Sequence, residues 1–294
     1  MDKLKILVIG GTRFFGVHLA RTLLREGHEV TIATRGNAQD DFGNNIHRIM
    51  VDRSDSQAMK NAFRGKYYDV ICDNIAYSSN DVRYLMEAVN CGRYILTSSA
   101  SVYPELGLDT KESDFNADTH PLIWCKREDY SYDEIKRQAE CALYQIYPAM
   151  SSAAVRLPYV IGEDDYTKRL YYYVEHIVKA IPMHVDNPSE EIAYIRSSEA
   201  GDFIAWLACS ELVGPVNACS KGTITLEEIF AYIEKKTGKK PLINPEAEAA
   251  PYNQGEAFSL NTGKAEAAGY HFSELYCWIY ELLDHFIAEA LSNK

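Results

Sequence analysis

The chain has 294 residues and a formal net charge of −12 at pH 7. A chain of this length can bury a large core and form one big domain or two lobes. Its composition, 47% hydrophobic and 24% charged, is typical of a globular protein, and no apolar run approaches the ~18 residues that a membrane helix needs. The acidic balance argues against nucleic-acid binding, which relies on clustered lysine and arginine. We therefore expect neither a membrane nor a nucleic acid among its partners.

The cysteines and the first residues indicate a cellular compartment. Seven cysteines are scattered along the chain without Cys-x-x-Cys spacing, a pattern that suits reduced thiols better than a disulfide framework or a zinc site. The N-terminus runs directly into a short apolar strand, without the hydrophobic stretch and cleavage site of a signal peptide. We predict a cytoplasmic protein that binds no metal.

The first half alternates β-rich runs with amphipathic helical runs. Strands are predicted at residues 5–9, 29–34, 47–51, 69–74, 93–98 and 153–159, and helices near 16–26, 54–63, 80–89 and 132–147. Such alternation produces right-handed βαβ units. The strands are apolar nearly throughout, as strands covered on both faces are. The predicted fold class is α/β, a Rossmann-type doubly wound parallel sheet.

The second half has a looser pattern. A long polar loop occupies residues 103–130, and a loop of that length usually has a function or covers a site. Helices are predicted at 166–180, 198–209, 226–237 and 273–290. We predict a nucleotide-binding domain at 1–162 and a smaller, mainly substrate-binding lobe at 163–294, with segments around 194–220 returning to the first domain.

A glycine-rich turn follows the first strand. Gly10, Gly11 and Gly16 lie between an apolar strand and an amphipathic helix, the context in which glycines admit a pyrophosphate at a helix N-terminus. After the second strand, Thr34 and Arg35 stand where a carboxylate would bind the ribose 2′-hydroxyl of NAD. Arginine accommodates a 2′-phosphate, so we predict NADP(H) in preference to NAD(H), unless Arg35 is only a solvated charge.

One carboxylate follows the third strand. Asp52 could accept a hydrogen bond from the adenine amino group, although an aspartate that caps the next helix is nearly as good an interpretation.

Two Tyr-x-x-x-Lys pairs occur, Tyr132/Lys136 and Tyr232/Lys236. This spacing puts both side chains on one helix face, where an ammonium lowers the pKa of a tyrosine towards that of a general acid/base. With 21 tyrosines, roughly one such pair is expected by chance. Ser131 and Glu134 form a capping-box pattern that would place Tyr132 in a first helical turn.

Taken in order, these segments resemble the extended and atypical short-chain dehydrogenases/reductases, the NAD-dependent epimerase/dehydratase family. The resemblance spans nearly the whole chain. It rests on the glycine turn, Asp52, residues 73–76, the serine strand at 97–103, the helix from 131 to 136, the Arg-Leu-Pro-Tyr-Val-Ile-Gly segment at 156–162, and residues 214–228.

The resemblance implies roles for particular residues. Tyr132 would be the general acid/base, Lys136 would bind the nicotinamide ribose, and Ser99, with Ser98 as the fallback, would bind the reacting oxygen. The cofactor-binding set comprises Gly10, Thr12, Arg13, Phe14, Phe15, Gly16, Thr34, Arg35, Asp52, Arg53, Ile75, Ala76, Thr97, Lys136, Pro158 and Tyr159. Tyr103, Trp124 and Arg196 are possible substrate contacts, and Arg196 could equally pair with an acid.

Two residues depart from the family pattern. Arg13 replaces the middle glycine of the phosphate turn, as in atypical members that include chloroplast stem-loop binding proteins. Ala100 and Ser101 stand where sugar-nucleotide dehydratases carry an acidic pair. The second departure disfavours water elimination.

The predicted function is therefore an NAD(P)-dependent epimerase or reductase, an enzyme that transfers hydride at a secondary alcohol or ketone, possibly of a nucleotide-linked sugar. The alternative is a non-catalytic NADP sensor or RNA-binding protein, since fold does not fix function. A homodimer is expected through helices 80–89 and 132–147, with Tyr84, Leu85, Val89, Leu143 and Tyr144 as apolar contacts.

Overall fold

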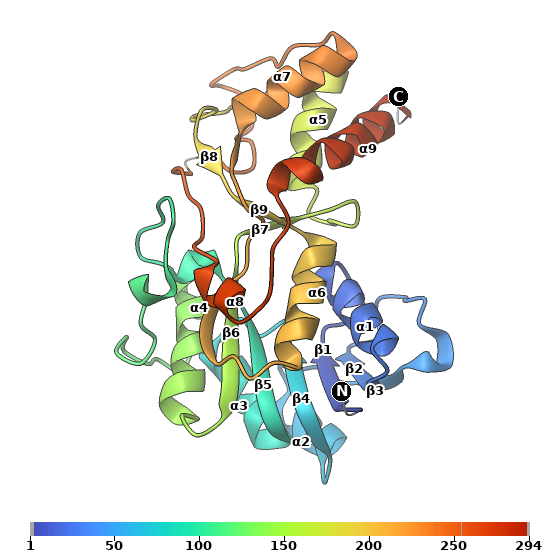
Figure 1. Cartoon of the computed structure of the whole chain (residues 1–294), viewed down its shortest axis with the longest axis vertical. Helices are drawn as coiled ribbons and strands as arrows, with labels where there is room; N and C mark the ends of the chain where they lie inside the picture. Colours follow the sequence, from blue (N-terminus) through green and yellow to red (C-terminus); the bar gives the residue numbers. More distant parts are fainter. Residues whose placement is uncertain (1–2, 254, 293–294) are drawn as a thin grey trace.

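A seven-stranded parallel sheet forms the centre of the larger lobe (Figure 1). The computed structural model describes residues 3–253 and 255–292. The strand order is β3-β2-β1-β4-β5-β6-β10, and every pairing is parallel. The strands are β1 (Lys5–Ile9), β2 (Glu29–Thr34), β3 (His47–Met50), β4 (Tyr67–Asp73), β5 (Asn90–Ser99), β6 (Ser151–Leu157) and β10 (Gly214–Asn217). The predicted Rossmann-type fold is confirmed.

The sheet is apolar on both faces. On β1, Ile6 and Val8 pack into one core cluster, whereas Leu7 and Ile9 pack into another. Successive side chains of a strand point to opposite faces, so burial on both sides requires an uninterrupted apolar run. This requirement explains why the strand was recognisable from sequence alone.

Helices cover both faces of the sheet. One face carries α1 (Phe15–Arg25) and α6 (Ser197–Ala208), and the other carries α2 (Ser56–Phe63), α3 (Ser79–Ala88) and α4 (Tyr132–Cys141). Helices α1 and α6 approach closely because Gly201 has no side chain; a Cβ there would lie 2.6 Å from the backbone nitrogen of Leu19. The order of strands reverses beside β1, where a doubly wound sheet opens its ligand crevice.

The second lobe gathers around three helices at the opposite end from the sheet (Figure 1). They are α5 (Arg169–Lys179), α7 (Leu226–Thr237) and α9 (Ile279–Ser292). Between the lobes, β7 (Tyr159–Ile161) pairs with β9 (Tyr194–Arg196). Within the second lobe, β8 (Glu191–Ile192) pairs with β11 (Ile224–Thr225), which leads into α7. The short helix α8 (Gly263–Ala267) lies beside β10.

Some predicted helices differ from those observed. The helix predicted at 132–147 changes to a π-helical turn at Ala142–Ile146, where Ile146 is exposed instead of completing an apolar face. The C-terminal helix predicted at 273–290 is a 3₁₀ turn at Leu275–Cys277 followed by α9. Both differences lie at helix ends or joints, where packing against neighbouring segments decides the conformation.

The apolar residues expected at a dimer interface lie elsewhere. Leu85, Val89 and Leu143 are buried within the protein, in the cluster beneath α3 and α4, and Tyr84 and Tyr144 are partly buried. The three buried residues therefore cannot form an exposed apolar contact surface, and this part of the prediction is wrong. The homodimer itself stays a prediction.

Among the helices of the described residues, none combines the length and the apolarity that crossing a membrane would take.

Candidate active site

The turn after β1 is built by two glycines and strained at one aromatic residue. Gly10 adopts φ +83°, and a Cβ on Gly16 would lie 2.5 Å from the carbonyl oxygen of Gly10. Phe14, the residue before α1, has φ 54° and ψ −142°, unusual for a bulky side chain. Its ring packs on Phe15 and Tyr166 at centroid distances of 5.5 and 6.0 Å. Backbone strain of this kind concentrates at functional sites.

A cavity of about 780 Å³ opens at this turn. Its volume falls in the range of ligand pockets, roughly 300–1,000 Å³. It runs from the N-terminus of α1 past the ends of β2 and β3 to the start of α3. Of the predicted cofactor-binding set, Gly10, Thr12, Arg13, Phe14, Phe15, Thr34, Arg35, Asp52, Arg53 and Ile75 line it. Gly16 is buried beneath the turn.

The buried polar groups of the cavity suit a dinucleotide. Asn74 and Asn80 both line it, and the Nδ2 of Asn74 and the Oδ1 of Asn80 are buried without a hydrogen-bond partner among the described residues. Buried polar groups without partners are rare in proteins. These two, together with the side-chain-free approach at Gly10, fit a polar ligand that donates and accepts hydrogen bonds in the cavity.

Two charged groups at the ends of β2 and β3 differ in their surroundings. Arg35 is exposed on the cavity wall with no carboxylate partner among the ion pairs of the described chain. Asp52 accepts hydrogen bonds from the backbone and hydroxyl of Ser54, which lower its pKa. The helix-capping role belongs to Asp55, whose carboxylate accepts from Gln57 and Ala58. The helix-cap interpretation of Asp52 is therefore wrong.

Arg53 contributes to the wall but its guanidinium is already engaged. Nη1 and Nη2 donate to the Asp73 carboxylate at 2.5 and 3.0 Å, and Nε lies 3.3 Å from Asp81. Burial would favour the neutral form, yet these two carboxylates keep the pKa of Arg53 above its ordinary value. Arg53 thus links the ends of β3 and β4 to α3, and it offers a cofactor little beyond its exposed edge.

Lys136 lies next to Tyr77, which forms part of the cavity wall. Its side chain is almost completely buried, and Nζ donates to the carbonyl oxygens of Ala76 and Thr97 at 2.8 and 2.9 Å. Burial lowers its pKa to about 8, while Asp73 and Asp81 oppose that effect. Neither Ala76, Thr97 nor Lys136 lines the cavity itself, because the ring of Tyr77 lies 4.7 Å from the ammonium.

Tyr132 lies beside Lys136 at the start of α4. Its ring is half exposed and 6.3 Å from the ring of Tyr77. Removal of the phenol from water raises the pKa of Tyr132, and the hydroxyl of Ser99 opposes this effect by stabilising the phenolate. The groups that lower this pKa are Ser99, Arg169 and Arg127 and not Lys136, so the expected lowering by Lys136 is wrong.

The predicted capping box of α4 does not form. Ser131 makes no side-chain cap, and the carboxylate of Glu134 interacts instead with His120 at 3.1 Å, Gln138 at 2.7 Å and Arg137 at 3.2 Å. The carboxylate of Glu134 is thus engaged by side chains and not by the backbone of residue 131. Tyr132 is nevertheless the first residue of α4, so its position in the first turn does not depend on the cap.

The two serines after Thr97 have distinct environments. Ser98 is buried and donates to the Glu140 carboxylate, which also pairs with the completely buried Arg156 at 2.7 Å. Ser99 is partly exposed, and its Oγ accepts hydrogen bonds from the backbone and hydroxyl of Ser101. Ser98 is therefore part of a buried ionic network, and Ser99 is the serine that faces Tyr132.

A second cavity, of about 350 Å³, lies where the lobes meet. It is lined by Pro104, Glu105, Leu106, Tyr159, Ile192, Tyr252, Gly255, Glu256 and Phe258. The guanidinium of Arg169 lies 5.4 Å from the ring of Tyr159 and also lowers the pKa of Tyr132. Arg169 thus contacts a residue of this cavity, and its charge also acts on Tyr132. Pro158 and Tyr159 are absent from the first cavity.

The three predicted substrate contacts have other partners. The buried hydroxyl of Tyr103 donates to Asn217 at 2.6 Å. Trp124 lines neither cavity and stacks with Arg83 at 4.5 Å. Arg196 lies 3.5 Å from Glu281, so the alternative of pairing with an acid is confirmed. Each of these side chains makes contacts within the chain, and a substrate role for any of them stays a prediction.

Several cavity residues went unnoticed in the sequence. Lys126, Arg127 and Glu128 come from the long loop, Tyr77 and Ser78 from the end of β4, and Tyr166 from the turn before α5. The position of Tyr77, four residues after a parallel strand, was a usable signal. The loop residues carried none, because only tertiary folding brings them to the nucleotide turn.

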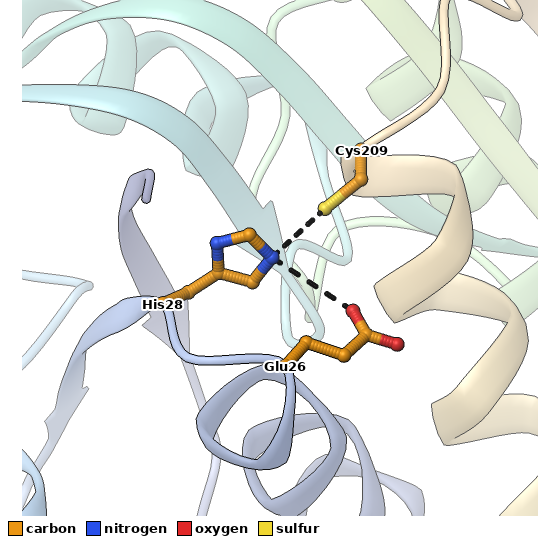
Figure 2. Close-up of side chains that lie close together, drawn as sticks. All are labelled: Glu26, His28 and Cys209. Atoms are coloured by element: carbon orange, nitrogen blue, oxygen red, sulfur yellow. Dashed lines mark hydrogen bonds and ion pairs between the residues drawn. The ribbon is translucent and has the colours of Figure 1, made fainter. Parts of the chain in front are cut away.

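One cluster of possible metal ligands among the described residues lies at the opposite edge of the sheet. Glu26, His28 and Cys209 approach one another between α1 and α6 (Figure 2). The Nδ1 of His28 accepts from the backbone nitrogen of Leu4 at 3.2 Å. In the neutral imidazole Nε2 must then carry the proton, and it faces Cys209 at 3.4 Å and Glu26 at 3.8 Å.

A metal ion would need the lone pair of that same nitrogen. A ligating histidine normally donates from its other ring nitrogen, which here accepts. Burial also raises the pKa of the Cys209 thiol, away from the thiolate that binds metals. We interpret the cluster as a hydrogen-bonded joint between the two helices.

Comparison with known proteins agrees with this geometry. Residues 6–85 match the profile described as the NAD dependent epimerase/dehydratase family. The matched stretch begins in β1, contains the glycine turn and ends within α3. The chain is also 37% identical, over 113 residues, to the chloroplast stem-loop binding protein of 41 kDa b from Arabidopsis thaliana. That alignment covers 34% of this chain and 30% of the plant protein.

Solved structures show the same fold over the full length. The UDP-glucose 4-epimerase of Thermus thermophilus, in complex with NAD, is 20% identical with a TM-score of 0.70, covering 96% of this chain and 98% of that one. The Thermotoga maritima UDP-glucose 4-epimerase with UDP-glucose is 16% identical, with a TM-score of 0.75 and 98% coverage of both chains. The predicted fold, a parallel Rossmann-type sheet followed by a smaller lobe, is thereby shared with solved structures along the whole chain.

Proposed function

We propose that this protein is an NAD(P)-dependent enzyme of the short-chain dehydrogenase type, which transfers hydride reversibly at a secondary alcohol or ketone. One observation carries the proposal. Tyr77 lines the nucleotide cavity, and its ring lies 4.7 Å from the ammonium of Lys136 and 6.3 Å from the ring of Tyr132. The cavity and the acid/base group therefore meet at one side chain.

The residues divide the chemistry as follows. A bound nicotinamide would supply or accept the hydride. Tyr132 gives its proton to the oxygen of a carbonyl as the carbon gains hydride, and it takes the proton back from the alcohol in reverse. Ser99 hydrogen-bonds that oxygen, and the positive charges of Arg169 and Arg127 stabilise the phenolate left behind, whereas Lys136 would bind the nicotinamide ribose. The raised pKa of Tyr132 keeps the phenol protonated, which suits reduction of a carbonyl.

The two cavities suggest how cofactor and substrate are divided. We assign the dinucleotide to residues 1–162 and the substrate mainly to residues 163–294. The segment around 194–220 returns to the nucleotide-binding domain, which is supported by α6 packing on α1 and by β10 pairing with β6. The smaller cavity between the lobes would hold the substrate, with Arg169 stacked on Tyr159 in its wall.

The cofactor is proposed to be NADP(H) in preference to NAD(H). Arg35 is exposed at the end of β2 without an acidic partner among the described residues, and the neighbouring Thr34 offers a hydroxyl. Thermal-shift titration with both cofactors tests this choice. We expect NADP(H) to stabilise the protein more, and Arg35→Ser to abolish the difference. Stronger stabilisation by NAD(H) would refute the preference.

The nucleotide retained after purification separates the two versions of the reaction. An epimerase keeps its cofactor. It would convert UDP-glucose, the ligand of the Thermotoga maritima structure, into its epimer without net change in nicotinamide absorbance. A reductase exchanges NADPH and consumes it with a carbonyl substrate. Neither interconversion nor consumption with a panel of nucleotide-linked sugars and ketones would refute the enzyme.

The second candidate is a non-catalytic NADP sensor or RNA-binding protein. Two observations favour it: the stem-loop binding protein is a 37% identical relative, and the ammonium of Lys136 is bound to two carbonyls. The net charge of −12 opposes RNA binding. A gel-shift titration with stem-loop RNA at about 0.15 M salt distinguishes the candidates, since a salt-resistant complex would favour this one.

A further inference from the structure

One wall of the nucleotide cavity comes from a distant loop segment, Lys126–Arg127–Glu128. These residues lie outside the region that matches the family profile, which ends at residue 85. They nevertheless face the cavity together with Tyr77 and Ser78. The segment is therefore a feature of this chain's long loop and not of the glycine turn.

The backbone that leads into this segment is fixed to the start of α3. The hydroxyl of Ser79 donates to the carbonyl oxygen of Ile123 at 2.7 Å and accepts from the backbone nitrogen of Cys125 at 2.8 Å. The nitrogen of Asn80 donates to the carbonyl of Cys125 at 3.3 Å. Ser79 and Cys125 are both completely buried. The segment thus starts from a rigid base.

The exposed tip is also ordered by the chain itself. The backbone nitrogen of Lys126 donates to the carboxylate of Asp129 at 2.7 Å, and the nitrogen of Asp129 donates back to the carbonyl of Lys126 at 3.2 Å. This closed turn presents Arg127 to the ring of Tyr77, with the guanidinium carbon 3.8 Å from the ring centroid. Stacking on an aromatic face fixes the orientation of an arginine.

Cationic side chains outnumber carboxylates in the cavity lining, where Asp52, Asp81 and Glu128 are the acidic residues. Arg13, Arg35, Lys126 and Arg127 all line it, and none of them has a carboxylate within ion-pair distance among the described residues. Arg13 and Arg35 come from the ends of β1 and β2, whereas Lys126 and Arg127 come from the loop. Cations from two separate parts of the chain therefore face one cavity in a protein of net charge −12.

We propose that Arg127, seated on Tyr77, clasps the phosphates of the bound dinucleotide and determines how slowly the cofactor leaves. The proposal rests on the dinucleotide binding of the proposed function, but not on turnover. A cation that holds an anionic ligand after docking acts mainly on the dissociation rate. A loop residue of this kind would decide whether the cofactor is retained through successive reactions or exchanged after each one.

The test measures NADPH release from the full-length protein by stopped-flow fluorescence. For Arg127→Ala we expect the dissociation rate to rise about tenfold or more, the change that loss of roughly 1.4 kcal/mol produces. ADP, which carries the diphosphate without nicotinamide, should lose affinity in the same variant, whereas adenosine should not. Arg127→Lys should restore part of the affinity for ADP, because it keeps the charge without the planar stacking group.

A matched control comes from α3, which carries an arginine stacked on an aromatic residue of the same loop. Arg83 stacks on Trp124, with the guanidinium carbon 4.5 Å from the ring, outside both cavities. Arg83→Ala should leave the NADPH release rate unchanged. An equal acceleration in Arg83→Ala would show that loop rigidity and not the clasp is at work, and would overturn the proposal.

The remaining outcomes separate this proposal from the proposed function. An unchanged release rate in Arg127→Ala overturns the clasp and leaves the enzyme intact. Slow release that depends on Arg127, in a protein that turns over no substrate, supports the clasp and refutes the enzyme. A parent protein that binds neither nicotinamide dinucleotide overturns both.

Discussion

Two Tyr-x-x-x-Lys pairs of identical spacing occupy very different surroundings. Lys136 is buried and bound to two carbonyl oxygens, and Tyr132 lies beside Ser99 at the meeting point of the lobes. Tyr232 and Lys236 lie on α7, and both donate to the carboxylate of Asp284 on α9, at 2.9 and 2.8 Å. The second pair joins two helices of the smaller lobe.

The two lysines therefore have pKa values shifted in opposite directions. Burial lowers the pKa of Lys136 to about 8, whereas the hydrogen bond to Asp284 raises the pKa of Lys236. Helical spacing only puts two side chains on one face. Whether they form a reactive group depends on what the rest of the chain places around them. The first pair lies next to Tyr77, a residue of the larger cavity.

The comparison predicts its largest effect on turnover. Tyr132→Phe should lower kcat about 10²–10⁴-fold, since general acid/base catalysis contributes that much, while leaving the affinity for NADP(H) unchanged. Tyr232→Phe, which removes the same hydroxyl from the other pair, should leave kcat unchanged. Steady-state kinetics together with cofactor titration measure both. Equal activity of Tyr132→Phe and the parent would remove Tyr132 from the mechanism.

A smaller effect is expected from the lysines. Lys136→Met should weaken NADP(H) binding about 10- to 100-fold, a loss of roughly 1.4–2.8 kcal/mol. The reason is that it removes the ammonium beside Ala76 and Thr97, which we expect to bind the nicotinamide ribose. Lys236→Met should not change it. Isothermal titration calorimetry compares the two variants, and similar affinities would mean that Lys136 is purely a structural residue.

The main sheet was predictable because its physical requirements are local. Strands β1 and β2 and helix α7 were predicted with their observed bounds, since each joins a continuous apolar pattern to a clear turn or cap. The paired strands β7, β8, β9 and β11 were not separated, because segments of two or three residues are defined by their tertiary partners. The bounds of such segments leave little trace in the sequence.

The candidate site divides in the same way. Residues near the glycine turn and at the ends of β2 and β3 line the cavity as expected, because parallel strands end at a common edge. Four features depend on contacts between distant segments. They are the hydrogen bonds of Lys136 to two carbonyls, the bond of Tyr103 to Asn217, the ion pair of Arg196 with Glu281, and the stacking of Arg127 on Tyr77. Spacing arguments cannot provide such contacts, and these are the points at which the prediction failed or was silent.

The smallest predicted effect is a difference in pH dependence between the two lysines. Below about pH 8, Lys136 is protonated in both folded and unfolded protein. Above it the folded protein releases this proton, whereas the unfolded lysine, with a pKa near 10.4, retains it. The unfolded state then binds more protons, so stability rises with pH. Relative to Lys136→Met, the parent should gain about 1.5 kcal/mol in free energy of unfolding between about pH 8 and pH 9.5.

Urea unfolding of the parent, Lys136→Met and Lys236→Met across this range isolates that contribution, because all other titrating groups are shared. Lys236 has a raised pKa, so its contribution is complete at these pH values and is lost only at higher pH. The parent and Lys236→Met should therefore follow parallel curves, while Lys136→Met should diverge from both. If all three curves are parallel, the ammonium of Lys136 is not desolvated, and the contrast between the two pairs reduces to their hydrogen-bond partners.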